Sequence, residues 1–399
     1  MRRCGAAAAV ALAAVLLLAT SSGATAPSGA GRRAGTEPIT YLGGKVLHAT
    51  RTHAIFWQPA GSGLVFDDGY RALVTRFLRD VAAASHATSN VLAITGQYAD
   101  AGGPAAYDSQ FAGAVLDTHA LPPSRCHEPA RSGPGWMLCL TDAELRHELE
   151  RLTAARQLAV GGDNVYFLLT PLGLGSCTTA GSTSCALGGR ATGYCGYHSV
   201  ASGGLLYAVI PYNAVSGHCQ SQNPRPNDNP ADPALSTIAH ELAETATDPY
   251  ADGWATRNGD EIADVCIAAF GPALGGAGTD RWNEDINGGH YWLQELYSRI
   301  RGRCEPRPQA DTAVIASPSD VVVNAPVTLA GRARQPGGSI VSYAWRFGHG
   351  GRGRGSEVVH TWSSPGRYRV ALKVVDAAGN WAYAFRWVRV TNSGGAIAR

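Results

Sequence analysis

The stretch STIAHELAETATDPYADGW, Ser236 to Trp254, contains the helix from which we predict the fold of the larger part of the chain. Asp232 is a suitable cap, and Pro233 suits the first helical position. The Asp248-Pro249 pair is a stop signal because the residue before a proline disfavours the helical conformation. These signals predict a helix from about Pro233 to Thr247.

This helix has a polar arc and an apolar arc at about 100° per residue. The polar arc contains His240, Glu244, Thr247 and Asp248, and the opposite arc contains Ile238, Ala239, Leu242 and Ala246. We expect the apolar arc to pack on a sheet. The simplest interpretation of the polar arc is a solvated surface, and the pattern leaves this alternative open.

A metal site is the second interpretation of the polar arc. His240 and Glu244 are four residues apart and point the same way, as two ligands on one helix must, and Glu241 stands beside them where a general base would lie. A catalytic site needs a third ligand, for which we prefer Asp264 in NGDEIADVC. Such a set suits zinc or a harder cation. Further candidate ligands are Asp248, Glu261, His198 and His290.

The region from 37 to 304 alternates strand-like and helix-like stretches. Predicted strands are His53 to Pro59, Asn90 to Tyr98, Asn164 to Pro171 and Gly204 to Asn213; predicted helices are Asp68 to Ser85 and Leu140 to Arg156, the second with Thr141 or Asp142 as its cap. Strands that alternate with helices predict an α/β domain. Together with the helix above, this order favours a mixed sheet like that of the zincins, although zincin helices carry His where Glu244 stands.

The cysteines predict that this domain is held by disulfides. Eight remain beyond the N-terminal leader: Cys126, Cys139, Cys177, Cys185, Cys195, Cys219, Cys266 and Cys304. An even number without any C-x-x-C pair favours disulfides over a cysteine zinc site or a cysteine nucleophile. Cys126 with Cys139 and Cys177 with Cys185 are close enough to staple local loops, while the complete pairing stays open.

The N-terminus indicates export. Residues 1–26 combine Arg2, Arg3, an apolar run and small residues at a cleavage site, which is typical of a signal peptide. A membrane anchor is the alternative, but the run is shorter than the ~20 residues that span a bilayer. We expect a secreted protein with a flexible segment at 27–36 and no integral membrane segment after cleavage. The formal net charge of +2 gives no sign of a nucleic-acid partner.

A second domain is expected after a linker at 305–311, and a flexible tail at 393–399 follows it. Residues 312–392 contain short alternating runs separated by Gly and Pro turns, which predict an immunoglobulin-like sandwich. The stretch SYAWRFGHG, followed by VVHTWSSPGRYRVALKVVDAAGN, resembles a PKD domain. His349 stands where that family often has Asp. The resemblance implies a spacer or adhesion module attached to an exported protein.

The larger region also resembles a family. CGYHS (Cys195 to Ser199), YAVIPY (Tyr207 to Tyr212), IAHELAETATDPYADGW (Ile238 to Trp254), GDEIADVC (Gly259 to Cys266) and NGGHYWLQELYS (Asn287 to Ser298) occur in this order. They are similar to the EXORDIUM or phosphate-induced protein family of secreted plant proteins and its bacterial relatives. In that family a Glu likewise follows the His-Glu pair at this position, so the resemblance implies that Glu244 is the family's own residue.

These observations favour a secreted metal-dependent hydrolase of peptidase type, with zinc as the expected metal and no organic cofactor. The alternative is a non-catalytic extracellular protein that binds the cell wall. The expected partner is an extracellular protein or a cell-wall polysaccharide.

Overall fold

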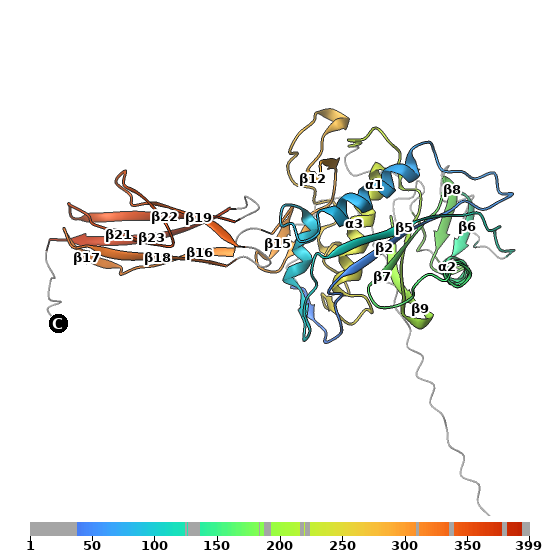
Figure 1. The fold of residues 1–399 in the computed structure, drawn as a ribbon, viewed down its shortest axis with the longest axis horizontal. Coiled ribbons are helices and arrows are strands. Elements are labelled where there is room, and N and C mark those ends of the chain that lie inside the picture. The colour runs from blue at the N-terminus through green and yellow to red at the C-terminus, as the bar shows by residue number, and fades with distance from the viewer. Residues whose placement is uncertain are drawn as a thin grey trace, which may run out of the picture.

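The computed structural model describes residues 38–123, 126, 136–182, 184–186, 193–215, 219, 224–308, 311–334, 339–376 and 381–392. The predicted signal peptide, the flexible segment at 27–36 and the tail at 393–399 lie outside these residues. An α/β domain is followed by an elongated β-sandwich, which extends away from it beyond strand β15 (Figure 1).

A five-stranded mixed sheet forms the centre of the α/β domain, in the order β5-β2-β7-β10-β9. Its strands are β5 (Ser109–Asp117), β2 (Thr50–Trp57), β7 (Asn164–Leu169), β10 (Leu205–Ile210) and β9 (Tyr197–Ala201). β5, β2, β7 and β10 run parallel to one another, and β9 pairs antiparallel with β10. β10 is buried along its whole length, as its unbroken apolar sequence LLYAVI requires.

Three α-helices surround this sheet: α1 (Tyr70–Ala83), α2 (Asp142–Arg156) and α3 (Asp232–Thr247). α1 packs on β5 and β2 and contacts α3, which packs on β10 and β9 (Figure 1). The cap prediction for α2 is confirmed at Thr141, whose hydroxyl accepts from the Glu144 N–H while the Glu144 carboxylate accepts from the Thr141 N–H.

Five of the six elements predicted for this domain outside α3 are confirmed, and the strand predicted over Asn90 to Tyr98 is wrong. This segment forms the 3₁₀ helix η1 (Val91–Gln97). Its start is fixed by Asn90, whose side chain accepts a hydrogen bond from the Leu92 N–H, and the Thr95 hydroxyl donates to the Leu92 carbonyl. These local bonds satisfy the backbone in a helical turn despite an apolar sequence that resembles a strand.

The remaining elements of the α/β domain are short. They are β1 (Thr40–Tyr41), β3 (Ala99–Asp100), β4 (Gly103–Pro104), β6 (Trp136–Thr141), β8 (Gly173–Cys177), η2 (Ser202–Gly204), η3 (Asn213–Val215), β11 (Trp254–Ala255), η4 (Asp264–Cys266), η5 (Gly278–Asp280), β12 (Glu284–Ile286), β13 (Gly289–Tyr291), β14 (Leu296–Ser298) and β15 (Arg303–Glu305). None of the helices in the described part of the chain is long and apolar enough to span a membrane.

Four disulfides are present in the described part of the chain, and all belong to this domain. They join Cys126 to Cys139, Cys177 to Cys185, Cys195 to Cys219 and Cys266 to Cys304. The two local staples expected from the sequence are therefore confirmed. Cys266–Cys304 fastens the segment after α3 to β15, at the end of the domain.

The C-terminal region is a β-sandwich. One sheet has the order β16-β18-β21 and the other β17-β23-β22-β19-β20. The strands are β16 (Asp311–Ala316), β17 (Asp320–Val322), β18 (Val327–Arg334), β19 (Ile340–Arg346), β20 (Arg352–Arg354), β21 (Glu357–His360), β22 (Gly366–Asp376) and β23 (Trp381–Thr391). Trp345, Trp362 and Leu372 are buried between the sheets. Of the expected linker 305–311, the first residue pairs in β15 and the last begins β16.

Candidate metal centre

α3 is the central helix of the α/β domain, and its boundaries agree with the prediction to within one residue. The predicted cap is wrong, because Asp232 is the first residue of the helix and the N-cap is Ala231. The Asp232 carboxylate instead accepts hydrogen bonds from the N–H groups of Asn227 and Asn229, which fastens the preceding loop to the helix.

The polar arc of α3 is buried, so the interpretation as a solvated surface is wrong. All residues of the helix are buried, and His240, Glu241 and Glu244 are 7%, 2% and 3% exposed. Burying several ionisable groups is costly unless each finds partners of opposite charge or a metal ion. The arrangement of this arc therefore calls for a specific physical explanation.

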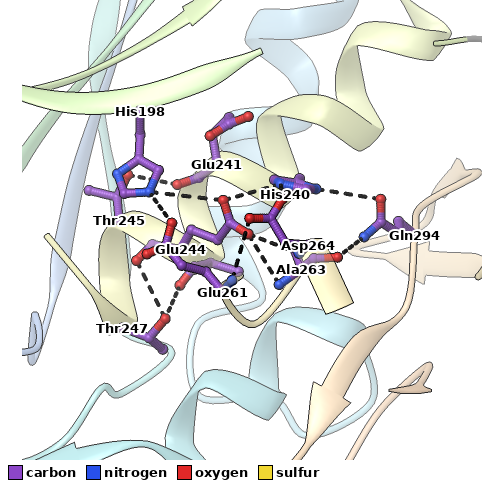
Figure 2. Close-up of polar contacts among 11 residues, drawn as sticks. His198, His240, Glu241, Glu244, Thr245, Thr247, Glu261, Ala263, Asp264 and Gln294 are labelled. Atoms are coloured by element: carbon purple, nitrogen blue, oxygen red, sulfur yellow. Dashed lines mark hydrogen bonds and ion pairs between the residues drawn. The ribbon is translucent and has the colours of Figure 1, made fainter. Parts of the chain in front are cut away.

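Glu244 lies at the centre of the cluster (Figure 2). Its Oε1 accepts hydrogen bonds from the N–H groups of Ala263 at 3.3 Å and Asp264 at 3.0 Å. These bonds turn Oε2 toward two imidazoles, at 3.1 Å from His240 Nε2 and 3.9 Å from His198 Nε2. The main chain of the downstream segment thus fixes the orientation of this carboxylate.

His240 is held from its other side by Gln294, a residue that was not among the candidates predicted from the sequence. His240 Nδ1 lies 3.4 Å from Gln294 Oε1, and the Gln294 amide donates to the Ala263 carbonyl. Because the Gln294 oxygen is an acceptor, this contact requires a proton on Nδ1. The Nε2 atom faces Glu244 Oε2 and, at 3.5 Å, Asp264 Oδ1.

His198 enters the cluster from the edge strand β9 and pairs with Glu261. Its Nε2 lies 2.9 Å from Glu261 Oε2, and both side chains are buried. Both residues were further candidates only: no spacing rule connects His198, on a strand, to a helix more than forty positions later, and Asp264 was preferred to Glu261 as the third ligand. The antiparallel pairing of β9 with β10 places His198 beside α3, and Glu261 lies in the segment that follows the helix.

Glu241 lies beside the start of β9. A side chain at Gly196 would come within 3.0 Å of Glu241 Oε1 and closer still to Thr237, so the absence of a side chain at this glycine makes room for the carboxylate. Glu241 also forms a group with His198 and Glu244 in which the potential ligand atoms lie within 4.8 Å of one another.

The expected ligands form a second group of this kind. One potential ligand atom each of His240, Glu244 and Asp264 lies within 4.8 Å of the others. Atoms that bind a tetrahedral zinc at about 2.0–2.1 Å are about 3.3 Å apart. The separations of 3.1 Å and 3.5 Å from His240 Nε2 to the two carboxylates bracket this value.

Several buried polar atoms of the cluster have no hydrogen-bond partner among the described residues. They are His198 Nδ1, His240 Nε2, Glu261 Oε1 and Asp264 Oδ1. The contacts of His240 Nε2 with the carboxylates therefore have the distance of an ion pair without the direction of a hydrogen bond. Of these atoms, His240 Nε2 and Asp264 Oδ1 lie 3.5 Å apart, and both residues form a ligand group with Glu244, so a cation could satisfy them and the residues fit a metal ion.

The charges of the cluster perturb one another. Burial lowers the pKa of His198, but Glu261, Glu241 and Glu244 together outweigh burial and raise that pKa to about 10. Burial also lowers the pKa of His240, but Glu244, Asp264 and Glu241 together raise it well above its ordinary value. Burial raises the pKa of Glu241 to about 8 and that of Glu261 well above its usual range.

The other candidates lie outside the two ligand groups. Asp248 follows α3 and accepts from the Gly253 N–H, which shapes the turn after the helix. His290 lies half-exposed on β13, stacks on Trp282 with ring centres 4.0 Å apart, and faces Asp285. Sulfur atoms of Cys126, Cys139 and Cys177 also lie close together, but they belong to disulfides and offer no thiolate.

Comparisons with known proteins identify the C-terminal region. The family model described as "PKD domain" matches residues 307–384. The PKD1 domain of Vibrio anguillarum Epp is 26% identical over 22% of this chain and 100% of its own, with a TM-score of 0.20. The PKD1 domain of the Vibrio cholerae metalloprotease PrtV is 26% identical over 20% of this chain and 93% of its own, with a TM-score of 0.18.

A structure of carbohydrate-binding modules from the β-sandwich superfamily is 29% identical over 23% of this chain and 38% of its own, with a TM-score of 0.22. Scores this low carry no argument about fold, so the assignment depends on the family match and on the sandwich itself. The predicted resemblance to PKD domains is confirmed. The C-terminal region of this chain is a PKD domain with a β-sandwich fold.

Proposed function

We propose that the α/β domain is a secreted, metal-dependent hydrolase of peptidase type with a zincin-like arrangement, and that the chain is a bacterial relative of the EXORDIUM family. The observation that carries the proposal is the buried group of His240, Glu244 and Asp264, in which His240 Nε2 and Asp264 Oδ1 have no hydrogen-bond partner among the described residues. A purely structural ion-pair network would gain by completing these bonds.

In this proposal His240, Glu244 and Asp264 hold the metal, and His198 stands beside them. Zinc is the expected ion, and when bound it would act as a Lewis acid and lower the pKa of a coordinated water. Gln294 orients His240, and the main chain at 263–264 orients Glu244, which are the supporting contacts that metal ligands require. Two carboxylate ligands reduce the net charge of the centre, which makes a hydrolase of modest activity the expected outcome.

Glu241 takes the role of general base. It belongs to the same helical turn as His240, yet its carboxylate points toward Gly196 and β9 and stays outside the expected ligand group. A carboxylate in this position can accept a proton from an attacking water and pass it to a leaving amine. The four disulfides suit an oxidising compartment, which is consistent with secretion.

The test separates the ligand from the base. Metal content and hydrolysis of an unbiased peptide library are measured for the wild type, His240→Ala and Glu241→Gln, with Asp285→Asn as an exposed control. His240→Ala should lose both metal and activity, because the remaining monodentate carboxylates hold a transition ion weakly. Glu241→Gln should keep the metal and lose activity at least about 100-fold. Full activity in Glu241→Gln would exclude Glu241 as the base.

A non-catalytic, wall-associated protein is the second candidate function. It is favoured by the exposed aromatic side chains Tyr383, Phe385 and Trp387 on the PKD domain, because carbohydrates bind to such rings. Wild-type protein that binds metal but hydrolyses no peptide would support this candidate over the hydrolase.

A further inference from the structure

The two domains carry opposite charges. Residues 311–392 contain ten Arg and Lys against four Asp and Glu, whereas residues 38–308 contain 18 Arg and Lys against 26 Asp and Glu. The near-neutral total for the whole chain hides this difference. A strongly basic domain of this size is an electrostatic signal for an anionic partner.

The cations of the PKD domain gather on the outer face of its larger sheet. Val370, Leu372 and Val374 on β22 point into the core, so the alternate residues Arg367, Arg369 and Lys373 point outward. On the neighbouring strand β23, the register places Arg389, Trp387 and Tyr383 opposite these three cations. The pairing therefore aligns one row of cations with one row of mostly aromatic residues.

The same face continues across β19 and β20. Arg346 pairs with Arg352, and Ala344 pairs with Arg354. All three arginines are exposed, and the buried neighbour Trp345 shows that Arg346 points away from the core. Asp320 is the acidic residue among the described side chains of this face. Its carboxylate lies 2.7 Å from Arg389 Nε. We call this surface the basic face; its residues are Arg346, Arg352, Arg354, Arg367, Arg369, Lys373, Tyr383, Phe385, Trp387 and Arg389.

Three large aromatic side chains lie in line on this face. Tyr383, Phe385 and Trp387 are 49%, 54% and 53% exposed, and they follow one another at alternate positions of β23. The rings of Tyr383 and Phe385 are nearly parallel, with centres 5.8 Å apart. The core of the sandwich is filled by other aromatics, so burial on folding does not account for these three. An exposed row of this kind indicates a binding surface.

Cations lie over each of the three rings. Arg369 Cζ is 3.9 Å from the centre of the Phe385 ring, Arg367 Cζ is 5.1 Å from that of Trp387, and Lys373 Nζ is 5.9 Å from that of Tyr383. Stacking on a ring reduces the conformational freedom of an arginine side chain before a ligand binds. The N–H groups in the guanidinium plane can still donate to a carboxylate or a similar acid group. The basic face thus combines ordered donors for anions with apolar rings.

We propose that the basic face binds an anionic polysaccharide. Carboxylate or sulfate groups of the polymer would bind the arginines, and the apolar faces of its sugar rings would lie against the aromatic row. The sandwich is elongated and its strands run along its length, which suits a chain-like ligand (Figure 1). This inference is independent of the metal centre.

Two other anionic partners fit the surface less well. The four disulfides favour an oxidising compartment outside the cytoplasm, where acidic glycans are more accessible partners than nucleic acids. The rings lie in the middle of a strand and not at a protruding loop tip, and membrane insertion needs apolar groups that reach about 5–10 Å into the bilayer.

The test measures binding of the full chain to sodium polygalacturonate by calorimetry at low and high salt. Wild-type protein should bind saturably, and affinity should fall as salt rises. Arg367→Ser with Arg369→Ser should reduce affinity about tenfold or more. The matched control is Arg257→Ser with Arg332→Ser, which removes the same charge from exposed positions elsewhere and should bind like the wild type. Thermal unfolding checks that each variant folds.

If the first double variant fails to fold, Arg346→Ser with Arg354→Ser replaces it, because no ring contact holds these two arginines in the described structure. Wild-type affinity in the variants of the basic face would overturn the proposal, as would an equal loss in the matched control. Binding to a DNA oligonucleotide or to phosphatidylglycerol vesicles as tight as to polygalacturonate would overturn the assignment to a polysaccharide. Loss of affinity in Trp387→Ala would support sugar stacking on the aromatic row.

Discussion

The α/β domain and the PKD domain place their charges in opposite ways. Around α3 the α/β domain buries two histidines and several carboxylates, each dependent on one or two neighbours a few ångströms away. The PKD domain spreads its arginines over an exposed sheet, where water screens each of them. A buried charge therefore acts through its individual partners, whereas exposed charges act together, through the combined charge of the surface.

The largest expected difference between the domains is their response to a reductant. All four disulfides lie before Glu305, and the sequence has no cysteine beyond Cys304. Each disulfide contributes about 2–4 kcal/mol to stability, so reduction should unfold or strongly destabilise the α/β domain and leave the PKD domain folded. Hydrogen exchange measured by mass spectrometry with and without reductant checks this. Loss of protection in residues 311–392 would show that the two domains do not fold independently.

The next largest effect is expected from His198→Ala in chelator-treated protein. The substitution leaves Glu261 buried without the imidazole that lies 2.9 Å from it. Removing one partner of a buried ion pair costs about 3–5 kcal/mol, so the melting temperature of the α/β domain should fall clearly. Arg354→Ala on the basic face is the matched exposed change and should leave the melting temperature of its own domain unchanged. If His198→Ala and Arg354→Ala lower the melting temperatures of their domains equally, buried and exposed charges do not differ in the way described.

A smaller effect is expected at Glu284, a buried carboxylate remote from the cluster in sequence. Burial raises the pKa of Glu284 well above its usual range. Because the folded state then binds the proton more tightly than the unfolded chain, stability decreases as pH rises from the unfolded value toward the raised one.

Glu284→Gln removes this loss. At each pH, the melting temperature of the wild type is subtracted from that of Glu284→Gln. This difference should be about 2–4 °C larger at about pH 8 than at about pH 4. Comparing the two pH values cancels any constant effect of the amide. If the difference in melting temperature between Glu284→Gln and the wild type is the same at both pH values, the pKa of Glu284 is not raised.

Local signals in the sequence were enough for the three α-helices and for β2, β7 and β10 of the central sheet, but not for β5 and β9. α2 has a capping box, and α3 lies between a helix-starting proline and an Asp-Pro stop. η1 was missed because Asn90 and Thr95 select a helical turn through side-chain bonds that an apolar periodicity does not reveal. The PKD domain was predictable because its turn residues and alternating strands are specific to that family.

The site was predictable only in part. Helical spacing identified His240 and Glu244, since both project from one helix. The position of His198 depends on the pairing of β9 with β10, and that of Gln294 on the path of the chain after Cys266, neither of which a spacing rule contains. The basic face was missed because the charge was summed over the whole chain, where the acidic α/β domain cancels it.

Titration with zinc tests whether the cluster around Glu244 is a metal site. The wild type and His240→Ala are freed of metal with a chelator and titrated by calorimetry, with the metal content of untreated protein measured in parallel. We expect one high-affinity site in the wild type and its loss in His240→Ala, because this imidazole supplies the nitrogen of the ligand group. Wild-type protein that carries no metal when purified without chelators, and acquires none on titration, would contradict the claim.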